Sequence, residues 1–182
     1  KNLFYDLKLN RRINLKIIDI RDYNKVKKFI HKVKPNIIFH LAAQPLVIDS
    51  YFKPIDTFNI NVNGTMNILD IIRSCSSVKS FIGVTSDKCY ENVGKKKGYA
   101  ETDKLGGSDP YSASKAATEL VINSYYKSFF ASKNKCGISS VRAGNVIGGG
   151  DWSGNRLIPD CIRSLLINKE IFIRNPNYPR PW

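Results

Sequence analysis

Short apolar runs alternate along this chain with longer segments of helical periodicity, and this alternation constrains its fold more than any other feature. The runs NIIFHLA (36–42) and VKSFIGVTS (78–86) are almost entirely apolar, which is typical of strands buried on both faces of a sheet. Between them, residues 54–75 have the pattern of one long helix with Pro54 near its first turn. The order strand, helix, strand predicts an α/β protein with a parallel sheet.

The same alternation continues on both sides of this central segment. Helices are expected at three further places, namely residues 22–33 with Asp22 as the N-cap, 109–130 and 157–169. Strands are expected at three further places, namely residues 13–19, 137–143 and 170–174. The chain contains no internal repeat and no low-complexity linker, so its 182 residues are consistent with one domain by length.

Composition narrows the class of protein. The chain is 42% hydrophobic and 24% charged, which is enough apolar material for a core. Its net charge is +14, from 29 Lys and Arg against 15 acidic residues, and such a balance can mark a nucleic-acid-binding module. However, the basic residues are scattered, and the sequence has neither a zinc-finger nor an RNA-recognition signature. We therefore expect an anionic small-molecule substrate and no nucleic-acid partner.

The cysteines and apolar runs indicate the compartment. Four cysteines occur at spacings that match no metal or redox pair, namely Cys75, Cys89, Cys136 and Cys161. No apolar run is long enough for a membrane helix, and the first residues lack the apolar core of a signal peptide. We expect a cytoplasmic protein with free thiols, no metal and no membrane partner.

Polar side chains follow three of the predicted strands at the point where each strand ends. The tips are HLAAQ (40–44), VTSDK (84–88) and RAGN (142–145). Parallel sheets bind their ligands outside the carboxyl ends of their strands. Any one tip could be an ordinary loop, but the three together predict a functional site at this edge of the sheet.

The sequence YSASK (111–115) adds a tyrosine and a lysine four residues apart on a predicted helix, so both side chains lie on one face. A nearby ammonium group lowers the pKa of a phenol from its usual value of about 10, which makes the phenol usable as a base near neutral pH. This spacing alone is common by chance. Here Tyr111 and Lys115 lie on the helix that follows Ser86, whose hydroxyl can polarise the oxygen that Tyr111 deprotonates.

Ser86, Tyr111 and Lys115 in this arrangement resemble the extended short-chain dehydrogenase/reductase superfamily. Several stretches resemble its nucleotide-sugar 4,6-dehydratases, in particular those acting on CDP-glucose; they are LAAQPLV, TSDKCYEN, LGGSDPYSASKAATEL, RAGNVIGGGDW, RLIPDCIR and IRNP…RPW. The resemblance covers almost the whole chain. It implies a Rossmann-like, doubly wound parallel sheet, NAD as cofactor, CDP-glucose as substrate and a homo-oligomer.

The resemblance also implies roles for individual residues. NAD would be contacted by Asp19, Ile20, Leu41, Ala42, Ala43, Tyr111 and Lys115. The nucleotide sugar would be contacted by Gln44, Ser86, Asn145, Arg156 and Arg180, the two arginines at the diphosphate. Asn145 could instead cap a turn, and Arg180 alone would be an ordinary surface residue.

In such a dehydratase Tyr111 takes the proton of the sugar C4 hydroxyl while hydride leaves C4, and water is then lost across C5 and C6. Ser86 would orient the substrate, Asp87 would protonate the departing C6 hydroxyl, and Lys88 would remove the C5 proton. At its usual pKa of about 10.4 a lysine is almost fully protonated near neutral pH, so this role requires burial or nearby positive charge to lower the pKa. An electrostatic role for Lys88 in stabilising the enolate is the alternative.

One motif of the superfamily is not found in this sequence, namely the Gly-x-x-Gly-x-x-Gly turn that seats the cofactor pyrophosphate. We therefore interpret residues 1–150 as a partial NAD-binding domain and residues 151–182 as the start of the nucleotide-sugar-binding portion. The chain would be an internal fragment that is inactive alone, with a truncated pseudoenzyme as the alternative. A 4-epimerase or reductase on the same scaffold is the alternative function.

Overall fold

The computed structural model describes residues 3–132 and 136–178, and the chain divides into two compact units. The larger unit comprises residues 18–143, and the smaller unit combines residues 1–17 with residues 144–182. The larger unit contains the sheet and all five predicted catalytic residues.

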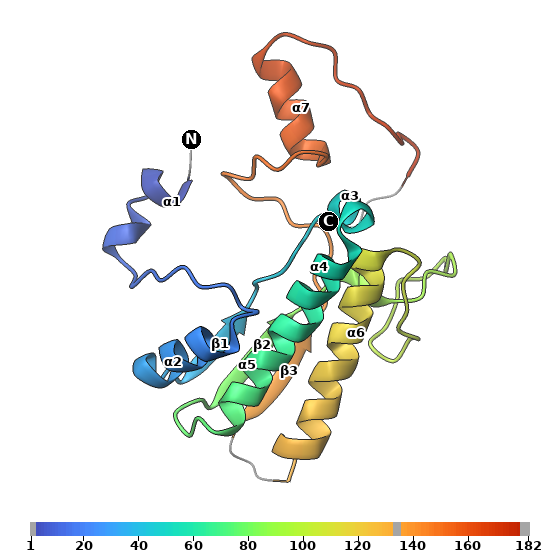
Figure 1. Cartoon of the computed structure of the whole chain (residues 1–182). Helices are drawn as coiled ribbons and strands as arrows, with labels where there is room; N and C mark the ends of the chain where they lie inside the picture. The colour runs from blue at the N-terminus through green and yellow to red at the C-terminus, as the bar shows by residue number, and fades with distance from the viewer. Residues whose placement is uncertain (1–2, 133–135, 179–182) are drawn as a thin grey trace. The chain divides into compact units, whose positions relative to one another are not determined.

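The sheet of the larger unit has three parallel strands in the order β1-β2-β3 (Figure 1). Their bounds are Ile37–His40 for β1, Ser80–Val84 for β2 and Gly137–Val141 for β3. In the register of the ladder, Phe81 on β2 lies between Ile38 on β1 and Ile138 on β3. Helices connect the strands, so the predicted α/β class with a parallel sheet is confirmed.

The helices of the larger unit have the bounds Tyr23–Val33 (α2), Val47–Phe52 (α3), Pro54–Phe58 (α4), Gly64–Arg73 (α5) and Pro110–Tyr125 (α6). Helices α2, α4 and α6 begin at Asp, Pro or Asp-Pro signals in the sequence, whereas α3 and α5 have no side-chain cap. Asp22 caps α2 by accepting a hydrogen bond of 3.0 Å from the amide of Lys25, as predicted. Two π-helical segments, Asn59–Asn63 and Tyr126–Phe130, join α4 to α5 and extend α6. The helices predicted at 54–75 and 109–130 are thus confirmed, each with a local widening, whereas α3 was not predicted.

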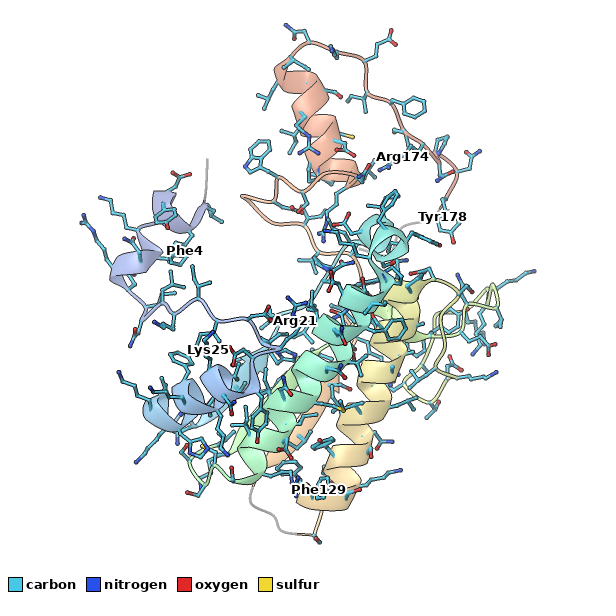
Figure 2. All side chains as sticks on the ribbon, in the orientation of Figure 1. Phe4, Arg21, Lys25, Phe129, Arg174 and Tyr178 are labelled. Carbon is cyan, nitrogen blue, oxygen red and sulfur yellow. The ribbon has the colours of Figure 1, made fainter. Side chains whose placement is uncertain are left out.

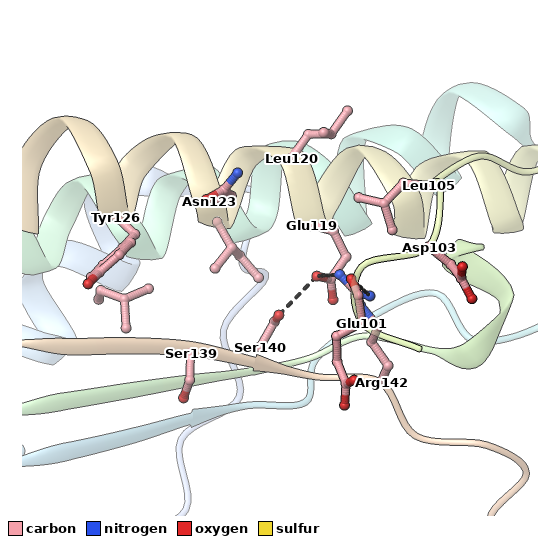
Figure 3. Close-up of a pocket in the computed structure, with 12 residues that line it drawn as sticks. Glu101, Asp103, Leu105, Glu119, Leu120, Asn123, Tyr126, Ser139, Ser140 and Arg142 are labelled. Carbon is pink, nitrogen blue, oxygen red and sulfur yellow. Dashed lines mark hydrogen bonds and ion pairs between the residues drawn. The ribbon is translucent and has the colours of Figure 1, made fainter. Parts of the chain in front are cut away.

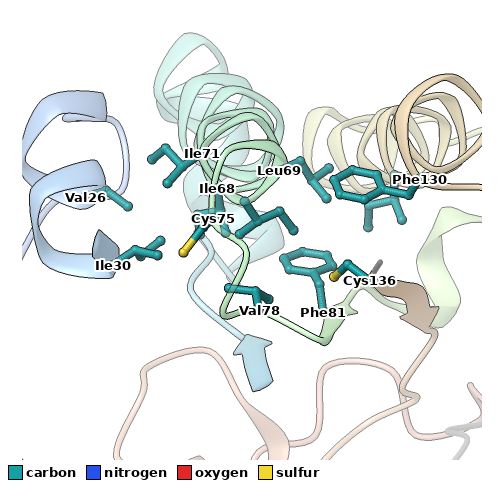
Figure 4. Packing of buried hydrophobic residues seen from close by; sticks show 12 residues of the cluster. Val26, Ile30, Ile68, Leu69, Ile71, Cys75, Val78, Phe81, Phe130 and Cys136 are labelled. Carbon is teal, nitrogen blue, oxygen red and sulfur yellow. The ribbon is translucent and has the colours of Figure 1, made fainter. Parts of the chain in front are cut away.

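One face of the sheet is covered by helices, and the core lies there. Helices α5 and α6 run side by side across this face (Figure 1), and their apolar side chains meet Phe81, which is fully buried (Figure 4). On the opposite face Ile37 is 54% exposed and Phe39 is 66% exposed. The prediction that β1 is buried on both faces is therefore wrong for this structure, because none of the helices described in the larger unit covers the second face.

Two predicted strands are not strands in the structure. Residues 14–19 and 170–173 are irregular, and Ile17 is 88% exposed. A strand is stable only when its backbone groups pair with a neighbour, and among the described residues neither segment has a ladder partner. The prediction of strands at residues 13–19 and 170–174 is therefore wrong, because apolar composition alone does not provide the pairing that a strand requires.

The smaller unit is helical. It contains α1 (Leu3–Asp6), a 3₁₀ turn at Leu9–Arg11 and α7 (Leu157–Leu166), which confirms the helix predicted at 157–169 with a shorter end. Gly150 has a φ of 82°, and a Cβ atom there would lie 2.5 Å from Cβ of Leu3, so only glycine suits this position.

Three chemical features complete the description. All four cysteines are free. In the parts of the chain that the structure describes, no cluster of three or more His, Cys, Asp or Glu residues could hold a metal ion. Of the helices described, none combines the length and apolarity needed to cross a membrane.

The core predicts a large difference between two phenylalanines on neighbouring strands. Phe81→Ala removes a fully buried ring and should lower the free energy of unfolding by about 3–5 kcal/mol. Phe39→Ala is the matched control, since Phe39 is 66% exposed and its loss should change stability by about 0.5 kcal/mol or less. Urea unfolding of the 182-residue chain measures both, and equal losses would show that the face bearing Phe39 is covered.

Candidate active site

Tyr111 and Lys115 lie on the first two turns of α6. The start of this helix is marked in the sequence by a capping residue and a proline. Asp109 is the N-cap and accepts a hydrogen bond of 3.0 Å from the amide of Ser112, and Pro110 occupies the first helical position. Tyr111 is 8% exposed and Lys115 is 5% exposed. The predicted pair is therefore on one helix face, and that face is buried.

Ser86 follows β2 in extended conformation and caps a short 3₁₀ turn, Asp87–Cys89. Its hydroxyl accepts a hydrogen bond of 3.2 Å from the amide of Lys88 and donates one of 3.0 Å to the Asp87 carboxylate. Helix α6 packs against this turn. The structure thus brings Ser86 and Asp87 to the helix that carries Tyr111 and Lys115.

The tips of β2 and β3 are held together beyond the regular ladder. The amide of Thr85 donates to the carbonyl of Val141 at 2.8 Å, and the amide of Asp87 donates to the carbonyl of Ala143 at 2.9 Å. These bonds set the direction in which the chain leaves β2. The backbone at Ser86 is therefore positioned by the neighbouring strand as well as by α6.

Lys88 does not have the buried environment that its predicted role as a base requires. Its side chain is exposed rather than buried, because Cys89 is the residue of the 3₁₀ turn that points into the interior. The burial expected to favour the unprotonated amine of Lys88, the form that can accept a proton, is not present in this structure. Its proposed role as the C5 base stays a prediction.

Lys115 is a buried cation in the second turn of α6. Burial lowers the pKa of its ammonium group, and the Glu119 carboxylate one turn further along α6 partly opposes this effect. A buried ammonium at the edge of a parallel sheet fits the hydroxyl groups of a nucleotide ribose, so the residues present here suit the expected dinucleotide.

Asn61 was not predicted from the sequence, and it joins two parts of the site. It lies in the π-helical segment between α4 and α5 and is 2% exposed. Its amide accepts a hydrogen bond of 2.8 Å from the amide of Gln44 and donates one of 2.8 Å to the hydroxyl of Ser114 on α6. Asn61 thus ties the tip of β1 to the helix between Tyr111 and Lys115. No pattern distinguishes it from Asn59 or Asn63 in the sequence.

Glu119 and Arg142 were also missed. They form a buried ion pair of 2.8 Å, with side-chain exposures of 4% and 16%. Glu119 could have been found from the sequence, because Tyr111, Lys115 and Glu119 are spaced by four residues and share one helix face.

Apart from Tyr111 and Lys115 on α6, the residues predicted to contact the cofactor lie at two places in the larger unit. Asp19 and Ile20 precede α2, near Arg21 (Figure 2). The Asp19 carboxylate accepts a hydrogen bond of 2.7 Å from Arg21, and this contact lowers its pKa to about 2. Ile20 packs against Gly64, where a Cβ atom would lie 2.5 Å from Cδ1 of Ile20. Leu41, Ala42 and Ala43 follow β1.

The residues predicted to contact the substrate are more dispersed. Gln44 donates two hydrogen bonds of 3.0 Å, to the carbonyl of Leu46 and the hydroxyl of Thr57, which stabilise its own loop. Asn145 and Arg156 belong to the smaller unit, where Arg156 is 3.3 Å from Asp151. Arg180 lies outside the described residues.

Comparison with known sequences matches residues 2–168 to the family described as GDP-mannose 4,6 dehydratase. Over 185 aligned residues the chain is 47% identical to CDP-glucose 4,6-dehydratase from Salmonella typhimurium, which covers 100% of this chain and 52% of that enzyme. The chain thus spans about half the length of this relative.

Comparison with solved structures confirms the Rossmann-like fold. A dTDP-glucose 4,6-dehydratase from Streptomyces venezuelae, solved with NAD, matches with a TM-score of 0.72 and 26% identity over 83% of this chain and 44% of that chain. A UDP-glucose 4-epimerase from Thermus thermophilus, also solved with NAD, matches with a TM-score of 0.67 and 29% identity over 76% and 43% of the two chains.

His40, at the end of β1, should make the free energy of unfolding depend on pH. It is 6% exposed, and its Nε2 atom lies 3.0 Å from the hydroxyl of Thr65. Burial, with a smaller effect of Lys115, lowers its pKa from 6.5 to about 4. The folded state therefore binds this proton less readily than the unfolded state does.

The contribution of neutral His40 to stability should be complete above pH 6.5 and lost as the pH falls toward 4. At pH 5 the expected loss is about 2 kcal/mol. His40→Asn should reduce the decrease in unfolding free energy between pH 7.5 and pH 5 by this amount, measured by urea unfolding. The exposed His31 provides the control, since His31→Gln should leave the decrease unchanged; an unchanged decrease in both variants would contradict the prediction.

Proposed function

Because the chain belongs to the GDP-mannose 4,6 dehydratase family, we propose that the intact protein is a nucleotide-sugar 4,6-dehydratase that acts on CDP-glucose with NAD as its cofactor. The observation that carries this proposal is the pair of Tyr111 and Lys115, buried one turn apart on α6 beside the Ser86 turn. The identity of 47% to the CDP-glucose enzyme of Salmonella typhimurium supports the choice of nucleotide.

The first half of the reaction is oxidation at sugar C4. NAD, when bound, supplies the acceptor for the C4 hydride. Tyr111 accepts the proton of the C4 hydroxyl, and the Lys115 ammonium favours the phenolate form that can do so. The Ser86 hydroxyl, at the carboxyl end of β2, orients the same oxygen. Burial of both α6 side chains keeps bulk water away from this proton transfer.

The second half is loss of water. The 4-keto group acidifies the C5 hydrogen, which Lys88 removes as a base or helps to remove by stabilising the enolate. Asp87, which accepts a hydrogen bond from Ser86, protonates the departing C6 hydroxyl. Water leaves, the hydride taken from C4 ends at C6, a proton returns to C5, and the product is CDP-4-keto-6-deoxyglucose.

We assign residues 1–150 to a cofactor-binding domain and residues 151–182 to the nucleotide-sugar-binding portion. Asp19, Ile20 and the loop 41–43 would face the cofactor. Gln44, Asn145, Arg156 and Arg180 would face the substrate, with Gln44 acting chiefly through the loop that its hydrogen bonds stabilise. The intact protein would work in the cytoplasm as a homo-oligomer.

A nucleotide-sugar 4-epimerase is the second candidate function. The UDP-glucose 4-epimerase from Thermus thermophilus has a TM-score of 0.67 to this chain, and the Tyr111–Lys115 pair would serve both reactions. Epimerisation returns the hydride to C4 and has no need of Asp87 and Lys88. The fate of the C4 hydrogen therefore separates the two candidates.

The first experiment follows that hydrogen. We expect the intact protein to convert CDP-glucose labelled with deuterium at C4 into a 4-keto-6-deoxy product with the label at C6, as read by NMR and mass spectrometry. UDP-glucose and dTDP-glucose are the comparison substrates and should react more slowly. A product that retains the label at C4, or turnover of UDP-glucose alone, would support the epimerase and exclude the proposed dehydratase.

The second experiment separates oxidation from elimination in the intact protein. Tyr111→Phe should form no enzyme-bound NADH after mixing with CDP-glucose, because the C4 proton has no acceptor. Lys88→Met keeps a stem of similar length, so it should still form NADH while elimination slows by about 10²–10⁴-fold. Single-turnover absorbance at the NADH band, together with solvent-deuterium exchange at C5, measures both steps. C5 exchange at the wild-type rate in Lys88→Met would show that Lys88 is not the base.

A further inference from the structure

Glu119 is a buried carboxylate on the helix face that carries the proposed catalytic pair. It is 5% exposed and follows Lys115 by four residues, as Lys115 follows Tyr111. Residues four apart on a helix are neighbours on its surface. Lys115 therefore lies between the phenol of Tyr111 on one side and the carboxylate of Glu119 on the other.

The contacts of Glu119 join three elements of the larger unit. Its Oε2 atom accepts hydrogen bonds from Arg142 at 2.8 Å and from Ser140 on β3 at 2.9 Å, as Figure 3 shows. Its Oε1 atom accepts a hydrogen bond from the hydroxyl of Thr85. Thr85 directly precedes Ser86, so this single side chain links α6, the end of β2 and β3 next to the proposed site.

Arg142 is held in turn from its other side. Its Nη1 atom donates hydrogen bonds of 3.0 Å to the hydroxyl of Tyr90 and to the carbonyl of Glu101. Its guanidinium group lies 4.9 Å from the centre of the Tyr90 ring. The cation is thus positioned by two further segments, and it cannot follow Glu119 freely if Glu119 moves.

The charges of Glu119 and Arg142 affect the pKa of the neighbouring Lys115. Burial raises the pKa of Glu119, but hydrogen bonds from Arg142, Thr85 and Ser140 outweigh burial, so its pKa is lowered and the group is charged at neutral pH. For Lys115, burial lowers the pKa and the Glu119 carboxylate opposes the change. Without the carboxylate, Lys115 would feel both burial and the unbalanced charge of Arg142.

We propose that Glu119 is a positioning residue that, with Arg142, clamps the strand end bearing Ser86 against α6 and keeps Lys115 in its ammonium form beside Tyr111. The inference rests on the proposed function only for the identity of the reaction. The clamp and the charge state of Lys115 are properties of the protein without substrate.

Other ionisable groups around the clamp do not account for a change of charge near neutral pH. On β1, His40 has its pKa lowered to about 4 by burial and by Lys115, so it is neutral. On the turn after β2, burial raises the pKa of Cys89 to about 11, so it is also neutral. The remaining groups near the clamp are Asp87 in that turn and Tyr90 directly after it, with Glu101 and Asp103, which line one cavity together with Glu119 and Arg142 (Figure 3).

The direct test is the titration of Lys115 in the intact protein. Lysine labelled with ¹³C at Cε reports each ammonium group by NMR, and Lys115→Met assigns the signal. Glu119→Gln should lower the pKa of Lys115 by about 1, a tenfold change in proton affinity. Arg142→Gln should raise it by a similar amount, because the carboxylate is then unbalanced. Opposite signs are expected only from an electrostatic role.

Two variants serve as controls. Glu119→Asp keeps the charge and should keep the Lys115 pKa near its wild-type value. Glu101→Gln removes an exposed carboxylate from the lining of the same cavity and should have no effect. If Glu119→Gln does not fold, the pKa of Lys115 can be compared between Arg142→Gln, which removes the positive charge of the pair, and Arg142→Lys, which keeps it.

A kinetic measurement links the titration to the reaction. The alkaline limit of NADH formation from CDP-glucose should move to lower pH in Glu119→Gln and to higher pH in Arg142→Gln. Unchanged Lys115 titration in both variants, with only a lower rate or stability, would overturn the inference and leave a purely structural ion pair. Absence of CDP-glucose turnover in the wild type would instead contradict the proposed function, since the NMR titration needs no substrate.

Discussion

The packing of α6 against the carboxyl end of the parallel sheet is the constraint on which the proposed site depends. Phe81 and Ile122 are buried where this helix meets β2, and this contact brings the N-terminal turns of α6 to the 3₁₀ turn after Ser86. A parallel sheet ends all its strands at one edge, so the polar tips need no further device to meet there. Apolar packing thus sets the distance between the Tyr111–Lys115 pair on α6 and the turn after Ser86. The polar side chains at this edge would then carry out the chemistry.

Hydrogen bonds of buried polar side chains then fix the loops and strand ends at the carboxyl edge of the sheet. Asn61, in the π-helical segment, ties the loop after β1 to Ser114, and π-helical insertions are frequent at functional sites. Glu119 ties the ends of β2 and β3 to the other side of the same helix. Both groups are almost fully buried, where an unsatisfied polar atom costs about 1–3 kcal/mol. Loss of either contact should therefore disturb geometry before it unfolds the domain.

The relatives show how one framework serves more than one reaction. Sugar dehydratases and sugar epimerases both match this chain in structure, so the same framework of sheet and helices occurs in both classes of enzyme. The turn Asp87–Cys89 is a short local element at the end of β2. Exposed Lys88 lies on that turn, where contact with a bound substrate, rather than the protein interior, would decide its chemistry.

The sequence by itself determined the α/β class, the positions of the main helices and the pair of Tyr111 and Lys115, because periodicity, caps and spacing along one helix are local properties. Tertiary structure decided the rest. Residues 13–19 and 170–174 have the composition of strands, but a strand requires a partner that composition does not reveal, and β1 has one exposed face for the same reason. The partners of Asn61 and Glu119 are 17 to 53 residues away for the first and 21 to 34 for the second, so only the folded chain shows that these buried groups hold the edge of the sheet together.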